Sequence, residues 1–146
     1  MILFGALDYG EIRHESDTTK IKPLPKSFAD LQNLELLDLG RNGLSFCPSQ
    51  IASLKNLKIL RLDYNNIHKI PTFISDLKNL KELSVCANEK ILLPESLSKI
   101  PGLKVFIGNN SLKLTDQKKL QKRFPNITFS FDNEYDDASA NEESTK

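Results

Sequence analysis

Leucine and isoleucine recur at fixed intervals along the central part of this chain. Three segments follow the pattern Leu-x-x-Leu-x-Leu-x-x-Asn or a close variant, and they begin 23 residues apart, at Leu34, Leu57 and Leu80. Each segment continues with Pro-x-x-Ile-x-x-Leu or a variant of it, beginning at Pro48, Pro71 and Pro94. A repeat of this length with regular apolar positions predicts a solenoid of stacked coils, in which each coil packs only against its neighbours.

The Leu-x-Leu part of each repeat predicts a strand, because apolar and polar residues alternate there as in a strand that buries one face. One strand per repeat, stacked in order, forms a parallel sheet with neighbours ~4.8 Å apart. The Asn that follows can donate to and accept from backbone groups where the chain turns. We therefore expect Asn65→Leu to leave such groups unpaired, at a cost of about 1–3 kcal/mol.

The proline of each repeat predicts where the strand stops, because its ring fixes φ and removes a backbone donor. The apolar residues after it are spaced close to three apart, which is typical of a short 3₁₀ or helical turn on the outer side of the coil. The apolar side chains that one coil can bury roughly offset its ordering cost but do not exceed it. The coils must therefore stack to be stable.

The repeat pattern covers residues 21–114 and weakens at both ends. The strand position before the first repeat would fall on residues 11–19, which are too polar to fit it well, so we assign residues 1–20 to an N-terminal cap or degenerate repeat. The segment Met1–Leu7 is apolar but lacks a basic start, which favours a short strand or end cap over a signal peptide. Near the other end one residue has been lost, so the pattern leaves two inward-facing pairs open. These are Val105 with Ile107 and Phe106 with Gly108.

The residues after the repeats predict an end cap and a tail. Thr115 and Asp116 can cap a helix, and the alternating apolar residues of Ile127–Phe131 predict a final strand. We therefore assign residues 115–131 to a C-terminal capping helix and strand that cover the open end of the stack. Residues 132–146 are acidic and nearly free of apolar side chains, so we predict that they are disordered.

This pattern resembles that of leucine-rich repeat proteins of the 23-residue intracellular class, and the ending is similar to that of short bacterial members. The resemblance implies an α/β fold, a right-handed solenoid with a parallel sheet on its concave face and short 3₁₀ or helical segments on its convex face. It also implies a non-catalytic module that binds another protein or a peptide on the concave face. The sequence departs from the pattern at Lys90, which replaces an expected Leu, and in the shortened last repeat.

Candidate partner contacts are the outward positions of each predicted strand and of the turn after it. Arg and Tyr among them are enriched at binding hot spots, and Asp38 can pair with Arg61 on the adjacent strand. The candidates are Leu36, Asp38, Arg41, Ile59, Arg61, Asp63, Tyr64, Glu82, Ser84 and Cys86. A sheet this narrow offers fewer side chains than a standard interface. We therefore expect modest affinity, or a short peptide or helix as the ligand.

Lys58, Lys81 and Lys104 occupy the second position of successive repeats. We favour an ordinary solvated edge, and the alternative is a row that faces an anion. The acidic residues 132–146 could reach ~20 Å on average, which motivates the hypothesis that they screen this row and compete with an acidic partner. Basic residues of the predicted helix favour a solvated face, and no aromatic platform for nucleic acid accompanies them.

The overall composition excludes several classes of partner. A formal net charge of +1 argues against strong whole-chain attraction to nucleic acid or to anionic lipid. No apolar run approaches the ~20 residues of a membrane span. Cys47 and Cys86 fall on opposite sides of the coil, which disfavours a disulfide. Two unpaired thiols without a signal peptide predict a cytoplasmic location, and we expect a monomer.

No arrangement of residues indicates catalysis. His14 and His68 lack a Ser, Cys or carboxylate at a spacing that the repeat would bring together. The sequence has no Gly-rich phosphate loop and no metal-spaced His/Cys cluster, so we predict no enzyme activity, cofactor or metal. Two alternatives to an interaction module remain open. One is a recognition fragment of a larger effector or signalling protein, and the other is a structural scaffold without a dedicated ligand.

Overall fold

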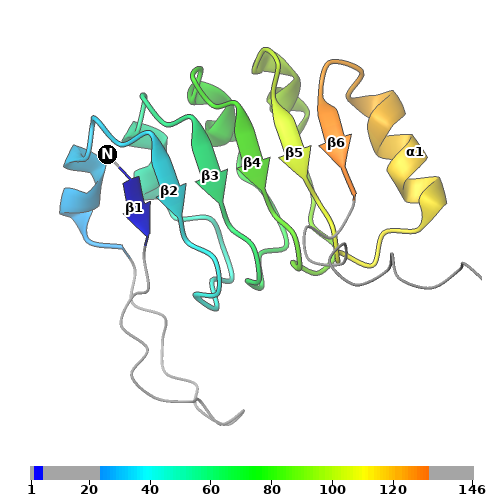
Figure 1. Ribbon diagram of the computed structural model, residues 1–146, viewed down its shortest axis with the longest axis horizontal. Helices are drawn as coiled ribbons and strands as arrows, with labels where there is room; N and C mark the ends of the chain where they lie inside the picture. The colour runs from blue at the N-terminus through cyan, green and yellow to red at the C-terminus, as the bar shows by residue number, and fades with distance from the viewer. Residues whose placement is uncertain (1, 5–23, 132–146) are drawn as a thin grey trace, which may run out of the picture.

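The computed structural model describes residues 2–4 and 24–131 of the 146-residue chain. Its described strands form one six-stranded parallel sheet in sequence order. They are β1 (Ile2–Phe4), β2 (Leu36–Asp38), β3 (Ile59–Arg61), β4 (Glu82–Ser84), β5 (Lys104–Phe106) and β6 (Thr128–Ser130). The strands run side by side across one face, with the short helices behind them (Figure 1). This arrangement confirms the predicted solenoid.

The return path of each coil contains a five-residue 3₁₀ helix. These are η1 (Lys26–Asp30), η2 (Ser49–Ser53), η3 (Thr72–Asp76) and η4 (Glu95–Lys99). Each begins directly after a proline and ends with a backbone bond of the 3₁₀ type, as from the N–H of Leu54 to the carbonyl of Ile51 at 3.0 Å. The tight turn points one apolar side chain per helix inward, as predicted from the spacing of three.

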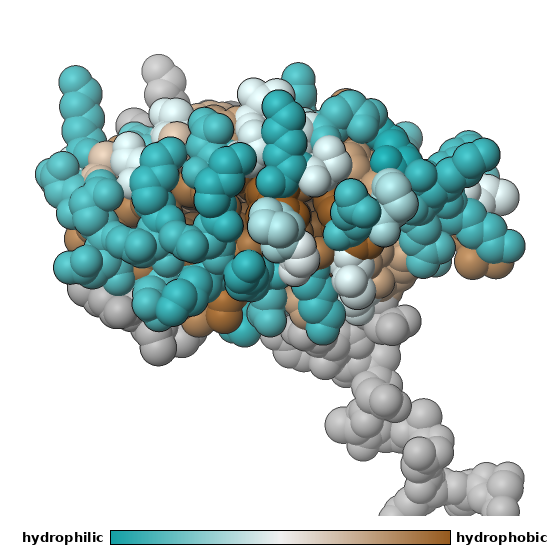
Figure 2. Space-filling view, turned by 90° about the horizontal axis from the view of Figure 1, so that it is seen from above, coloured by the Kyte–Doolittle hydropathy of each residue, from teal (hydrophilic) through white to brown (hydrophobic). Residues whose placement is uncertain are grey.

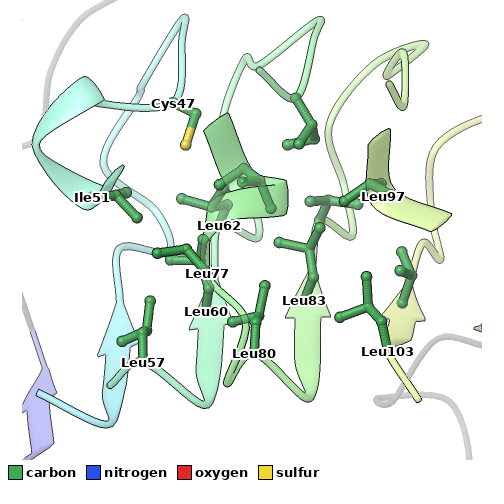
Figure 3. Close-up of a cluster of buried hydrophobic side chains, with 14 of the residues drawn as sticks. Cys47, Ile51, Leu57, Leu60, Leu62, Leu77, Leu80, Leu83, Leu97 and Leu103 are labelled. Atoms are coloured by element: carbon green, nitrogen blue, oxygen red, sulfur yellow. The ribbon is translucent and has the colours of Figure 1, made fainter. Parts of the chain in front are cut away.

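The core is a thin stack of aliphatic side chains between the sheet and the 3₁₀ helices. The central residues of successive strands, Leu37, Leu60, Leu83 and Val105, are fully buried. Figure 3 shows the inward side chains of the strands meeting those of the return path, such as Ile51 and Leu97. Because the packing runs from coil to coil, no single coil contains a complete core.

Asparagine side chains connect the coils where the strands end. The Oδ1 atom of Asn65 accepts from the backbone N–H of Leu44 at 2.9 Å, and its Nδ2 atom donates to the carbonyl of Leu39 at 2.9 Å. Asn88 repeats both bonds one coil later, with Ile67 and with the carbonyl of Leu62. These contacts confirm the predicted role of the Asn at the turn.

The residue before the turn asparagine adopts a positive φ in four successive coils, where this asparagine is Asn42, Asn65, Asn88 and Asn110. The values are 58° at Arg41, 53° at Tyr64, 51° at Ala87 and 55° at Asn109. A left-handed conformation is unfavourable for a residue with a side chain, so it persists only where the surroundings impose it. Here the Asn hydrogen bonds fix the turn, and the turn aims the preceding side chain outward.

The short strand expected within Met1–Leu7 is confirmed. Ile2–Phe4 pairs with β2, with Leu3 aligned with Leu37, whereas residues 11–19 lie outside the described part of the chain. Residues 2–4 are wholly apolar, as an inward-packing strand at the end of a stack requires. Residues 5–23 lie outside the described residues, and so do residues 132–146. The N-terminal cap beyond β1 and the disorder of the tail therefore stay predictions.

The end of the stack carries α1 (Leu114–Arg123) and then β6. The helix begins earlier than predicted, because its N-cap is Lys113, which makes no side-chain cap bond, and Thr115 and Asp116 lie within the first turn. A carboxylate in that turn still favours the helix dipole. Phe124 ends the helix fully buried, with its ring 6.1 Å from that of Phe129.

Of the two pairs that could face inward in the last repeat, the structure selects Val105 with Ile107. Val105 and Ile107 are 0% and 1% exposed, whereas Phe106 is half-buried and points outward. In the register of β4 and β5, Leu83 aligns with Val105, a separation of 22 residues rather than 23. The missing residue is therefore absorbed at the start of β5, before the inward alternation resumes.

Candidate partner-binding surface

The face of the sheet turned away from the 3₁₀ helices is called the concave surface here. The ten candidate residues all lie on this surface or at the edge formed by the C-terminal ends of its strands. Each of them is half-buried or exposed, whereas the strand residues between them are buried. Strand register aligns them in rows across the sheet. One row runs Leu36, Ile59, Glu82, Lys104, Thr128, and the next runs Asp38, Arg61, Ser84, Phe106, Ser130.

An apolar area and a shallow hollow lie at the centre of this surface. Leu36 and Ile59 are aligned neighbours, and both are half-buried. The hollow beside them is lined by Ile59, Arg61, Glu82, Ser84 and Phe106. Phe106 is absent from the sequence candidates, because its direction depended on the register of the shortened repeat. The structure adds it as an outward aromatic residue.

Arg61 forms the charged rim of the hollow. Its Nη1 atom lies 3.9 Å from Asp38 Oδ2, so the predicted pair exists but is long. Asp38 also accepts from the backbone N–H of Gly40 at 2.9 Å. The side chain of Arg61 is 45% exposed, and an ion pair of this length and exposure is weak. The guanidinium therefore remains accessible to an acidic group of a ligand.

Arg41 and Tyr64 form a second feature at the C-terminal ends of β2 and β3. The guanidinium carbon of Arg41 lies 4.4 Å from the centre of the Tyr64 ring. This is cation–π geometry, and both residues hold the positive φ described above. The turn and the stacking fix an amphipathic Tyr at the edge of the concave surface, where it can contact a partner at low entropic cost.

Asp63, Ser84 and Cys86 bond to one another within the sheet. Asp63 Oδ1 accepts from the hydroxyl of Ser84 at 2.5 Å and from the backbone N–H of Cys86 at 2.8 Å. The thiol of Cys86 in turn accepts from the N–H of Gly108 at 3.3 Å. Desolvation raises the pKa of Cys86, which disfavours the reactive thiolate. These polar groups support the surface more than they reach out from it.

The lysine row changes direction at Lys104, although the backbone N–H of Lys104 still donates to the carbonyl of Lys81 at 2.8 Å. Because β5 is shifted by one residue, Lys104 aligns with Glu82 on the concave surface and its amine lies 4.7 Å from the centre of the Phe106 ring. Lys58 and Lys81 remain neighbours at the N-terminal edge of the sheet. Lys58 bonds Glu35 Oε1 at 2.7 Å, and this hydrogen bond lowers the pKa of Glu35.

Two further lysines, which the sequence analysis did not single out, lie at the same edge. Lys55 and Lys78 occupy equivalent loop positions one coil apart, because Asn79 Nδ2 donates to the carbonyl of Lys55 at 2.9 Å. Asn56 bonds Gln32 in the same way at 2.8 Å. The twice-repeated Lys-Asn-Leu-Lys was the available signal. We define the basic edge as Lys55, Lys58, Lys78 and Lys81.

The described part of the chain carries neither a metal-binding cluster nor a membrane-spanning helix. No group of three or more His, Cys, Asp or Glu side chains in residues 2–4 and 24–131 could hold a metal ion. Within these residues, no helix has the length and apolar character needed to cross a membrane.

Comparison with solved structures finds the same fold in two bacterial proteins. A leucine-rich repeat protein of Leptospira interrogans matches with a TM-score of 0.56 at 24% identity, over 73% of this chain. Internalin C2 of Listeria monocytogenes matches with a TM-score of 0.53 at 24% identity, over 74% of this chain. The matches span 33% and 47% of those two proteins, so this chain is similar to less than half of each.

The comparison with sequence families agrees with this structural likeness. No curated protein matches the chain. A family model described as a leucine-rich repeat region matches residues 13–128, which is most of the chain. The match includes every described element from η1 to α1 and ends at the first residue of β6. The chain therefore belongs to the leucine-rich repeat family.

Proposed function

We propose that this protein is a non-catalytic interaction module that binds another protein or a peptide mainly through its concave surface. The observation that carries the proposal is the hollow beside Ile59, where apolar side chains adjoin the accessible guanidinium of Arg61. An apolar patch with Arg or Tyr beside it is the usual composition of the centre of a protein interface. The strands hold these side chains at fixed spacing, so little order is lost on binding.

The contacts within the surface divide the candidates into three groups. We assign ligand contact to Leu36, Ile59, Arg61, Tyr64 and Glu82. Asp38 orients Arg61, and Arg41 orients Tyr64. Asp63, Ser84 and Cys86 are assigned a supporting role, because their polar atoms already bond to one another. Phe106 and Lys104 extend the contact area toward β5.

The size of the sheet favours a small ligand. Six strands at ~4.8 Å spacing span about 24 Å, which is narrow for the ~20–30 residues that each side of a standard interface contributes. We therefore propose a single helix or an extended peptide of the partner as the bound element, held with modest affinity by a monomer of this chain.

The test compares binding by the double variant Arg61→Glu/Tyr64→Ala with binding by wild type. Lys118→Glu/Gln121→Ala is the matched control, because it makes the same kinds of change on exposed positions of α1. Proteins captured from a lysate by wild type and control but lost by the double variant would support the proposal. If each captured protein binds the double variant as well as wild type, the concave surface is the wrong site.

A second possibility is that the chain acts as the recognition part of a larger protein. It is favoured by the finding that the chain spans only 33% and 47% of the two similar structures. Sequencing the surrounding DNA tests it directly. An open reading frame that continues in phase into a further domain supports a recognition fragment, and in-frame stop codons on both sides argue for a separate module.

A further inference from the structure

We propose that the basic edge binds the acidic C-terminal segment of this same chain, residues 132–143. The four lysines of this edge lie on two adjacent coils, and all of them are exposed. The backbone N–H of Lys81 donates to the carbonyl of Lys58 at 2.8 Å, which fixes these two as neighbours. Figure 2 views this side of the molecule from above and shows a surface covered mainly by hydrophilic side chains.

The basic edge is an incompletely neutralised cluster. Among the described residues, Glu35 is the one carboxylate that forms an ion pair with it, through Lys58. Lys78 donates to the backbone carbonyl of Ser75 at 2.6 Å, which adds no negative charge. Neighbouring amines held near ~5 Å repel each other by up to about 1 kcal/mol in water. An anionic segment along the edge would remove this repulsion.

The chain carries its own complementary segment. Residues 132–143 contain six carboxylates and no Lys or Arg, and Lys146 is the one basic residue after them. The remaining residues, 1–131, therefore have a formal net charge of +6, although the whole chain has only +1. Opposite charge is thus concentrated in two parts of one molecule, where their effective concentration is high.

The segment is long enough to reach the edge. From β6 to β3 is three strand spacings, or about 14 Å, and twelve extended residues span about 40 Å. The chain leaves β6 at the end of the sheet opposite to the basic edge (Figure 1). A segment that binds the edge must therefore pass over the sheet or around the end of the stack.

Helix α1 is the alternative docking place, because it carries Lys118, Lys119, Lys122 and Arg123 close to the start of the segment. Two of these four are already paired with carboxylates. Lys119 lies 3.2 Å from Asp116, and Arg123 lies 2.5 Å from Glu95. On the basic edge one of four is paired in this way. The edge therefore offers more uncompensated charge, and α1 supplies the matched control.

The first experiment is carbodiimide cross-linking of the full chain, with the joined residues identified by mass spectrometry. A mixture of ¹⁴N- and ¹⁵N-labelled protein separates links within one molecule from links between molecules. We expect links from residues 134–143 to Lys55, Lys58, Lys78 and Lys81 at about 20 mM salt, with yields at least ~5-fold lower at about 500 mM. Links mainly to α1, yields independent of salt, or links only between molecules would each overturn the proposal.

The second experiment follows the amide resonances of residues 132–143 in the full chain by NMR. Lys58→Glu/Lys81→Glu is expected to move these resonances at low salt to their high-salt positions, while the control Lys118→Glu/Lys119→Glu leaves them in place. The resonances of β3 and β4 show in the same spectrum whether each variant is folded. Equal shifts in both variants, or none in either, would overturn the proposal. Neither experiment needs a partner, so its result is independent of the concave-surface proposal.

Discussion

The side-chain oxygen of Asn65 accepts a hydrogen bond from the backbone N–H of Leu44, which lies 21 residues earlier on the preceding coil. The amide of the same side chain donates to Leu39 and to its own coil at Leu62. One residue thus joins two turns of the solenoid through backbone groups that have no strand partner there. Because Asn88 repeats the arrangement, the coils depend on one another for polar as well as apolar contacts.

Loss of the Asn65 amide should therefore destabilise the whole stack. Asn65→Ala leaves the N–H of Leu44 and the carbonyl of Leu39 without these partners, and each such group costs about 1–3 kcal/mol. Asn56→Ala is the control, because it removes a single bond at an exposed loop. Urea denaturation should show a loss of at least about 2 kcal/mol for the first variant and under about 1 kcal/mol for the second. Equal losses would contradict the assigned role.

The end cap depends on Phe124. Its side chain is fully buried under the last coil, and removal of a buried Phe typically costs about 3–5 kcal/mol. We expect Phe124→Ala to lower the free energy of unfolding by that amount. Phe46→Ala makes the same chemical change at a position that is 63% exposed, and it should stay within about 0.5 kcal/mol of wild type. Thermal or urea unfolding of the pair measures the difference.

The ion pair of Asp38 and Arg61 should contribute little to stability. The atoms are 3.9 Å apart and the two side chains are 27% and 45% exposed, so we expect a coupling of about 0.2–1 kcal/mol. A double-mutant cycle with Asp38→Ala and Arg61→Ala measures it. A coupling well above 1 kcal/mol would make Arg61 a structural residue, and loss of binding in Arg61→Glu could then reflect unfolding.

Asp63 should matter more to stability than Asp38. Its carboxylate accepts both the Ser84 hydroxyl and the Cys86 backbone N–H, and hydrogen bonds to charged groups contribute about 1.5–3 kcal/mol each at most. We expect Asp63→Ala to destabilise the protein by more than Asp38→Ala, with partner binding retained by the fraction that stays folded. The reverse order in urea denaturation would place Asp63 among the contact residues instead.

The burial of the Cys47 thiol predicts that the protein loses stability in alkaline solution. Burial raises the pKa of this thiol from an ordinary value of 9.0 to about 12. The unfolded chain therefore loses the proton near pH 9, while the folded chain keeps it until about pH 12. Stability from this group is complete below pH 9 and declines by about 1.4 kcal/mol per pH unit across that window.

The Cys47 effect can be isolated from other groups that titrate at high pH. The difference in unfolding free energy between wild type and Cys47→Ala should favour wild type below pH 9 and shrink steadily from pH 9 to 12. Ellman's reagent should react with Cys47 only on unfolding, because the thiol is 6% exposed. A constant difference across the window, or rapid reaction of the folded protein, would contradict the burial of this thiol.

The coils and the outward strand positions followed from the sequence because they obey a repeated local rule. Leu37, Leu60 and Leu83 share one environment, so one alternation pattern predicted all three, and Arg61 faced outward for the same reason. Phe106 and Lys104 could not be placed in this way. One lost residue reverses which side of a strand is buried, and only the pairing of β5 with β4 located that loss.

The amino-acid sequence by itself determined the solenoid, the Asn ladder and the outward faces of β2, β3 and β4, because each is set by spacing within one repeat. The tertiary structure decided what depends on contacts between segments without a shared pattern. It selected Ile2–Phe4 to pair with β2, and it placed Lys104 beside Glu82. It also brought Lys55 and Lys78 next to the Lys58–Lys81 pair. Strand pairing can use any apolar segment that fits the open edge, and no local pattern states which one does.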